Sequence, residues 1–163
     1  MAIPAEVSLS KYEGDYRLRI LPIRELKSRR EPCNELRKGQ RSAYIPMNDK
    51  PLEVTMFWES KEETGQTKLQ VGDTLILADF EKHTLEFQNP AVYEEPVFID
   101  CKKEHLRNLK LIIDREVIEF YGNEGTIYGA VETEENLLVK EVRMESSVKI
   151  DSMKWYYLMA EGE

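Results

Sequence analysis

The side chains with the most chemical potential in this sequence are its aromatic rings and its carboxylates. Carbohydrate sites stack aromatic rings on the apolar face of a sugar, beside carboxylates and amides that hold the hydroxyl groups. Four residues have the right type for such a platform: Trp58, Tyr121, Trp155 and Tyr156. Large aromatic residues pack in cores more often than they bind ligands. We therefore expect most of these rings to be core residues, and a sugar-binding surface is the alternative hypothesis.

The sequence does not identify a catalytic pair among its carboxylates. A glycosidase that works with two carboxylates needs them on either side of the bond that it cleaves, one as acid and the other as nucleophile or base. The chain has 31 acidic residues, so their number alone decides nothing. Asn48 and Asp49 have the composition of a turn. Glu119 stands between two apolar neighbours, but strand side chains alternate, so we expect it to face away from them and to pair with a base such as Arg115 or to be solvated. No catalytic residue is predicted.

Other reactive constellations are missing from the sequence. The chain has no Gly-x-Ser-x-Gly elbow and no glycine-rich phosphate loop. His83 and His105 have no cysteine or histidine at ligand spacing, so neither a metal site nor a cofactor is predicted. Cys33 and Cys101 make no disulfide framework in a chain that is 41 % apolar, and we expect free thiols.

The charge distribution limits the classes of partner. A formal net charge of −8 disfavours nucleic acid, because phosphate binding requires a basic face. Residues 24–41 are a local exception, with seven bases against three acids. A solvated connecting segment is the favoured interpretation, and an anion or partner site is the alternative. No apolar run is long enough for a bilayer and the first residues do not resemble a signal peptide, so no membrane partner is expected and a cytoplasmic location is slightly favoured.

The strand pattern is clearest in residues 109–125. Alternating apolar residues lead to Asp114 and Arg115, which can turn the chain. A β-branched and aromatic run then leads to Asn123-Glu124-Gly125, in which the glycine supplies the positive φ that a loop requires. A third strand over residues 126–131 would complete a meander.

Much of the remaining sequence has the same period of two. Further short strands are predicted over residues 52–58, 74–79, 84–88, 97–100, 137–142, 148–150 and 153–158. Near the N-terminus, residues 16–20 alternate with Arg17 and Arg19, which we expect to point outward, and residues 103–107 are predicted as one helical turn. About a dozen short strands predict an all-β fold, a two-sheet antiparallel sandwich of the concanavalin or jelly-roll kind, with less than about a tenth of its residues in helix.

Residues 109–125 also resemble the C-terminal β-sandwich of glycoside hydrolase family 32, the levanases, invertases and sucrose-6-phosphate hydrolases. The residues that match the family pattern are Asp114, Arg115, Ile118, Glu119, Phe120, Asn123, Glu124 and Gly125. Residues 3–26 resemble the passage out of that family's catalytic propeller, and residues 150–158 resemble its closing strand. Between residues 30 and 100 only the strand pattern matches.

The resemblance implies a role as well as a fold. It implies that the motif residues Asp114, Arg115, Glu119, Asn123 and Gly125 are structural. The family's catalytic carboxylates lie in propeller segments, Trp-Met-Asn-Asp-Pro-Asn-Gly, Arg-Asp-Pro and Glu-Cys, none of which occurs here.

The expected molecule is therefore one sandwich domain, residues 1–163, whose residues 1–41 contain the connection to a catalytic propeller. It would brace that propeller in a fructan- or sucrose-cleaving enzyme, and in some members it would help to form a homodimer. A carbohydrate-binding module for fructan or another polysaccharide is the first alternative. A complete small hydrolase is the last.

Overall fold

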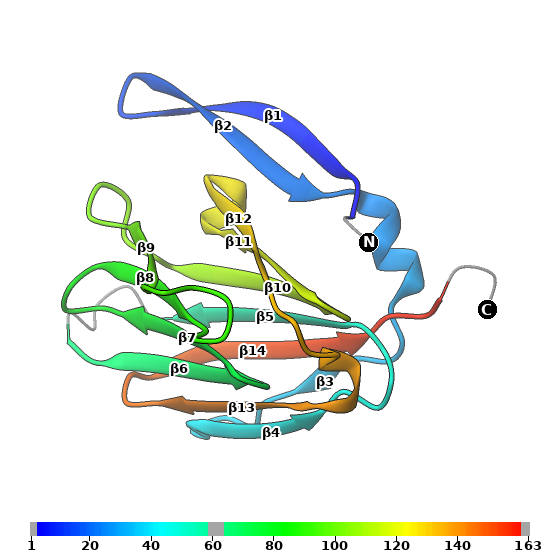
Figure 1. The fold of residues 1–163 in the computed structure, drawn as a ribbon. Coiled ribbons are helices and arrows are strands. Elements are labelled where there is room, and N and C mark those ends of the chain that lie inside the picture. Colours follow the sequence, from blue (N-terminus) through cyan, green and yellow to red (C-terminus); the bar gives the residue numbers. More distant parts are fainter. Residues whose placement is uncertain (1–2, 59–63, 161–163) are drawn as a thin grey trace.

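The regular secondary structure of the protein consists mainly of antiparallel strands (Figure 1). The structure is a computed structural model that describes residues 3–58 and 64–160. Two six-stranded sheets pack face to face, and a separate two-stranded hairpin lies outside them. Of the described residues, 56 % are strand and 8 % are helix, which confirms the predicted all-β sandwich and its low helix content. In the described part of the chain, no helix is long and apolar enough to cross a membrane.

The first sheet has the strand order β12 (Ile127–Glu132), β11 (Val117–Gly122), β10 (Asn108–Asp114), β5 (Leu52–Trp58), β14 (Ile150–Tyr157) and β3 (Asn34–Glu35). The second sheet has the order β4 (Ser42–Pro46), β13 (Glu141–Ser146), β6 (Gln66–Val71), β7 (Thr74–Asp79), β8 (Thr84–Gln88) and β9 (Val97–Asp100). The hairpin consists of β1 (Ala5–Tyr12) and β2 (Asp15–Pro22). Three short 3-10 segments complete the described elements: η1 (Arg24–Arg29), η2 (Asn123–Gly125) and η3 (Leu137–Val139).

The central meander forms as the sequence predicts. β10 pairs with β11, which places Leu111 opposite Phe120, and β11 pairs in turn with β12. The turn between β10 and β11 lies one residue later than expected, at Arg115 and Glu116, because Asp114 is still paired with Val117. The predicted pairing of residues 74–79 with residues 84–88 is confirmed by β7 and β8.

The main core fills the space between the two sheets. Leu52, Val54 and Met56 project inward from the central strand β5 and have no solvent exposure. Removal of apolar surface from water stabilises by about 25 cal/mol per Å², so this closed layer holds the sheets together. β5 is also covered on its other face, where Glu53 has no solvent exposure either.

The cover over that outer face is the N-terminal part of the chain. Leu26 of η1 forms a second, smaller apolar cluster with Ile112, Tyr121 and Leu158. Ile3, Ile20 and Leu21 pack against this cluster from the N-terminal segment and β2. The sequence therefore builds two layers of apolar contact, one inside the sandwich and one beneath the hairpin.

The helical turn predicted over residues 103–107 is wrong. The segment contains no helix, and its backbone groups are bonded instead by the side chain of Asn123. The Asn123 Oδ1 atom accepts from the Arg107 amide at 2.7 Å, and Nδ2 donates to the His105 carbonyl at 2.9 Å. A side chain distant in sequence thus satisfies groups that a helix would have paired locally.

Candidate docking site

The turn η2 has an unusual backbone that places it against the hairpin. Asn123, Glu124 and Gly125 have φ values of 49°, 58° and 97°, so three successive residues adopt the left-handed region. The predicted positive φ at Gly125 is confirmed. A Cβ atom on Gly125 would also lie 2.9 Å from the carbonyl carbon of Ile20 and closer still to its oxygen. Glycine is therefore required here both for its backbone conformation and for the close approach of β2.

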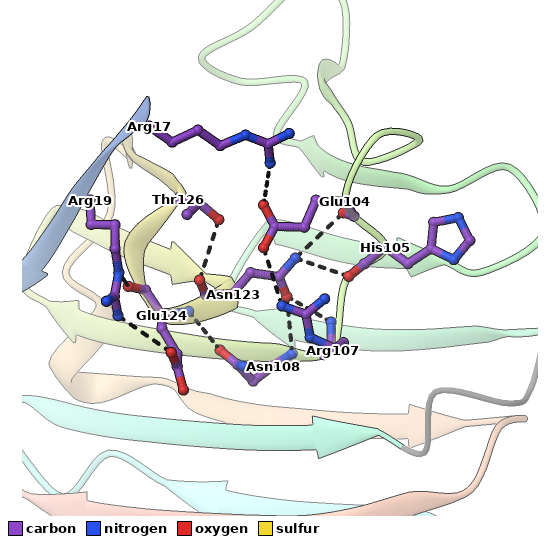
Figure 2. Close-up of polar contacts among 9 residues, drawn as sticks. All are labelled: Arg17, Arg19, Glu104, His105, Arg107, Asn108, Asn123, Glu124 and Thr126. Carbon is purple, nitrogen blue, oxygen red and sulfur yellow. Dashed lines mark hydrogen bonds and ion pairs between the residues drawn. The ribbon is translucent and has the colours of Figure 1, made fainter. Parts of the chain in front are cut away.

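Asn123 and Asn108 fix the segment that carries Glu104 (Figure 2). Besides its bonds to Arg107 and His105, the Asn123 side chain donates to the Glu104 carbonyl at 3.4 Å. The Asn108 Oδ1 atom accepts from the Glu124 amide at 3.1 Å. These bonds hold Glu104 and Glu124 on the side of the sandwich that faces the hairpin.

Two arginines of β2 bind those two glutamates, as Figure 2 shows. Arg17 Nη1 donates to Glu104 Oε2 at 2.5 Å, and the other Glu104 oxygen accepts from Arg107. Arg19 donates from Nε to the Glu124 carbonyl at 2.9 Å and lies 3.3 Å from the Glu124 carboxylate. The prediction that Arg17 and Arg19 point outward is therefore wrong. They face the sandwich because it offers carboxylates at the matching positions.

Glu119 provides a further contact to the N-terminal segment. It faces away from the main core as expected, but it is buried, and a backbone amide and a hydroxyl group bind it. Its carboxylate accepts from the Ile3 amide at 3.0 Å and from the Tyr121 hydroxyl at 2.9 Å, which corrects the expected pairing with Arg115. Burial and the nearby Glu119 carboxylate raise the pKa of Tyr121, so Tyr121 remains a hydrogen-bond donor.

The motif residues divide into two groups by location. Glu119, Asn123 and Gly125 lie where the N-terminal segment packs on the sandwich. Glu119 bonds to the Ile3 amide and Gly125 lies against the backbone of Ile20, while Asn123 holds the segment that carries Glu104. Asp114 and Arg115 lie at the β10–β11 turn, where the Asp114 carboxylate accepts from the Arg115 amide at 2.8 Å. The Arg115 carbonyl accepts from the Leu137 amide at 2.7 Å, so this turn anchors η3 instead.

The opposite face of the hairpin is apolar and exposed. Val7, Leu9, Tyr16 and Leu18 are 63 %, 71 %, 74 % and 42 % exposed. The register pairs Leu9 with Leu18, and the neighbouring pairs of the same face are Val7 with Ile20 and Tyr16 with Lys11. Ile20, toward the end of β2, is partly buried. Among the described strands β1 pairs only with β2, so its outer edge is unpaired. An apolar strand face beside an open edge has the character of an interaction surface. We call Val7, Leu9, Tyr16 and Leu18 the outer hairpin face.

The four candidate sugar-binding rings do not form one surface. Trp58 is buried, donates to Thr67 Oγ1 at 2.9 Å and packs edge-on against Phe80. Trp155 is partly buried and packs against the main core. Tyr121 is buried beneath the hairpin, and Tyr156 is half-buried with the Arg30 guanidinium 4.3 Å from its ring centre. The tryptophans thus lie on the inner face of the first sheet and the tyrosines on the outer face.

The remaining candidates take ordinary structural positions. Asn48 and Asp49 form a turn with φ values of 55° and 58°, as the composition predicts. Cys33 and Cys101 are free cysteines, the first exposed and the second buried. The imidazole rings of His83 and His105 stack with their centres 4.2 Å apart, a contact that their separation in sequence did not indicate.

Solved structures with a similar fold include several enzymes and a galectin from Caenorhabditis elegans, which gives a TM-score of 0.52 at 15 % identity and covers 75 % of this chain and 95 % of its own. An exo-inulinase from Aspergillus awamori superposes with a TM-score of 0.74 at 13 % identity, covering 98 % of this chain and 36 % of its own. A glycoside hydrolase family 32 protein from Bifidobacterium adolescentis gives 0.69 at 19 % identity, covering 98 % and 26 %. A sucrose-6-phosphate hydrolase from Lactobacillus gasseri gives 0.63 at 12 % identity, covering 93 % and 33 %. No protein-family model and no curated protein sequence matches the chain.

These superpositions define the class of domain. The chain has the fold of a part of glycoside hydrolase family 32 enzymes, and the likeness predicted from residues 109–125 is confirmed at the level of fold. It spans about a third of the length of these enzymes, whose chains continue well beyond the shared sandwich.

Proposed function

We propose that this chain is a non-catalytic C-terminal accessory domain of a fructan- or sucrose-cleaving glycoside hydrolase, and that its hairpin docks on the enzyme's catalytic propeller. The observation that carries the proposal is the outer hairpin face, an exposed apolar surface on an element whose other face is tied to the sandwich. The fold supports the choice of partner, because several of the similar structures are enzymes of family 32.

The hairpin is suited to brace a second domain because three contacts fix its orientation. Arg17 and Arg19 bind the glutamates of the sandwich, and Glu119 binds the backbone at Ile3. A docking element that is already ordered loses less conformational entropy on binding than a flexible one. The outer hairpin face would therefore present itself to the propeller at a defined angle.

The test is binding between this chain and the separately produced catalytic propeller of its parent enzyme, measured by isothermal titration calorimetry. The double variant Leu9→Ser/Leu18→Ser removes apolar surface from the outer hairpin face. Phe98→Ser/Val139→Ser is the matched control, since these residues are 60 % and 64 % exposed on the sandwich itself. We expect the first variant to weaken binding by at least tenfold and the control to change it by less than twofold. Equal affinities for all three proteins would refute docking through the hairpin.

Catalysis by the chain itself is not expected. Met47-Asn48-Asp49 shares the Met-Asn-Asp of the family's nucleophile segment, but Asp49 lies in a left-handed turn, and its amide donates to the Leu138 carbonyl. We expect no release of fructose from sucrose, levan or inulin by the purified chain. Turnover that survives repurification and disappears in Asp49→Ala would overturn the non-catalytic assignment.

Carbohydrate binding is the alternative function, and a titration with levan and inulin distinguishes it. Tyr156 is the candidate ring that lies on an outer sheet face and is only half-buried. Saturable binding of either polymer that is lost in Tyr156→Ala would favour a carbohydrate-binding module over a bracing domain.

A further inference from the structure

A basic pocket lies between the hairpin and the outer face of the first sheet. Its volume is about 540 Å³. β1 and β2 form one wall, η1 forms a second, and Arg30, Glu53 of β5 and Lys110 of β10 form the floor. Five basic side chains line this space, namely Arg19, Arg24, Lys27, Arg30 and Lys110, against the carboxylates of Glu6 and Glu53. This concentration of positive charge occurs in a chain whose net charge is −8.

The floor of the pocket carries more positive charge than its one carboxylate can neutralise. Glu53 is fully buried and accepts from Arg30 Nε at 2.9 Å and from Arg30 Nη2 at 2.5 Å. The Lys110 ammonium lies 3.4 Å from the same carboxylate. Hydrogen bonding to Glu53 raises the pKa of Arg30. Two cations therefore share one anion at the floor, which leaves a surplus of one positive charge.

The walls add a second unbalanced charge. Arg24 is paired with Glu6 at 3.4 Å, and Arg19 is paired with Glu124. Lys27 of η1 lines the pocket, and its ammonium makes no ion pair with another residue in the described ranges 3–58 and 64–160. Arg19 and Arg24 are neutralised by their glutamate partners. Among the described residues, Lys27 contributes one unpaired positive charge and the floor contributes a second, so the cavity has a surplus of two positive charges.

We propose that this pocket binds a small dianion of the phosphate class, either inorganic phosphate or the phosphate group of a monoester. A dianion matches the surplus charge. The planar guanidinium groups and the ammonium groups around the cavity supply the donors that phosphate oxygens accept. A concave site with walls of protein concentrates the field of its charges more than a flat surface does. The sequence alone favoured a solvated connecting segment for residues 24–41, whereas the fold places the first part of that segment against a buried carboxylate.

Calorimetric titration of the purified chain at pH 8 and low ionic strength tests the proposal, with inorganic phosphate, glucose 6-phosphate and unphosphorylated glucose as probes. We expect one phosphate site per chain, no binding of glucose, and an affinity that falls as sodium chloride is added. A markedly tighter affinity for glucose 6-phosphate would identify a phosphorylated sugar as the source. Equal affinities would identify free phosphate. The absence of saturable binding by both phosphates would overturn the proposal.

Charge reversal at one lysine separates a defined pocket from general attraction. We expect Lys27→Glu to weaken phosphate binding by at least tenfold. Lys68→Glu makes the same change of charge at an exposed position of β6 in the second sheet and should alter the affinity by less than twofold. Equal weakening by both variants would refute a site at this pocket. In amide NMR spectra, phosphate should shift the signals of Lys27, Arg30 and Lys110, and shifts confined to other residues would contradict the location.

The pocket is formed by this chain alone, so the measurement requires no catalytic domain. Phosphate binding without propeller binding would leave the pocket established and refute the docking role. Propeller binding without phosphate binding would support the docking role and refute the phosphate pocket.

Discussion

The sandwich body and the N-terminal hairpin use the same alternating sequence pattern with opposite results. In the body, the apolar positions of strands such as β5 and β10 face the partner sheet and are fully buried. In the hairpin, the outer hairpin face is exposed while Arg17 and Arg19 face the body. Of the apolar residues of β2, Ile20 and Leu21 toward its end pack against the body. The period of two determines which residues share a face. It does not determine which face is covered, because that depends on what lies opposite.

The sandwich body and the hairpin also differ in the interactions that stabilise them. The body has a continuous apolar core between its sheets. The hairpin rests on a small apolar cluster, two arginine–glutamate pairs and the bond between Ile3 and Glu119. The Arg19–Glu124 pair is exposed, and an exposed ion pair contributes only about 0 to 1 kcal/mol. Because its apolar cluster is also small, the hairpin should open before the body does.

A matched pair of leucine truncations should give the largest contrast between the regions. Leu111→Ala empties a fully buried position in β10 and should lower the free energy of unfolding by about 3 to 4 kcal/mol. Leu9→Ala acts on a side chain that is 71 % exposed and should change it by less than about 0.5 kcal/mol. Urea melts measure both values. A large loss in Leu9→Ala would mean that the outer hairpin face is covered within this chain.

A pair of glycine substitutions isolates the close approach between hairpin and body. Gly125 and Gly14 have similar φ values of 97° and 91°, but only Gly125 has backbone within reach of an added Cβ. Gly125→Ala should lower the free energy of unfolding by about 2 to 3 kcal/mol, because strain and a clash with Ile20 add together. Gly14→Ala should cost about 1 kcal/mol and affect the hairpin turn alone. Equal urea midpoints would show that β2 does not approach η2 as closely as the structure indicates.

The smallest effect is expected from one ion pair of the hairpin. Arg17→Gln removes the partner of Glu104 and should make hairpin opening easier by about 1 kcal/mol, or roughly a fivefold faster amide exchange in β1 and β2. Arg37→Gln is the control, since Arg37 is exposed in another segment. Hydrogen exchange monitored by mass spectrometry resolves the difference. Unchanged exchange in Arg17→Gln would mean that the apolar cluster alone holds the hairpin.

The elements that the sequence predicts well are those whose contacts are local. The β7–β8 pair, the β10–β11–β12 meander and the positive φ of Gly125 follow from alternation and turn chemistry within a few residues. Even the error at the β10–β11 turn is a single residue.

The features that the sequence did not predict depend on long-range contacts. Glu119 is bonded to Ile3, 116 residues away, so no local pattern could name its partner. Residues 103–107 lose their expected helical turn to the side chain of Asn123. The orientation of Arg17 and Arg19 required knowledge of Glu104 and Glu124. One signal of the hairpin contact was present in the sequence. Asn123-Glu124-Gly125 favours a left-handed turn, and a glycine without a side chain allows a second backbone to pass close to it.

The most direct test of docking is a hydrogen-exchange footprint of this chain with and without the catalytic propeller of its parent enzyme. The proposal predicts protection concentrated in β1 and β2, including the amides of Leu9 and Leu18, while the strands of the second sheet exchange as they do in the free chain. Protection confined to the outer face of the second sheet, with β1 and β2 unchanged, would contradict the claim that the hairpin is the docking element.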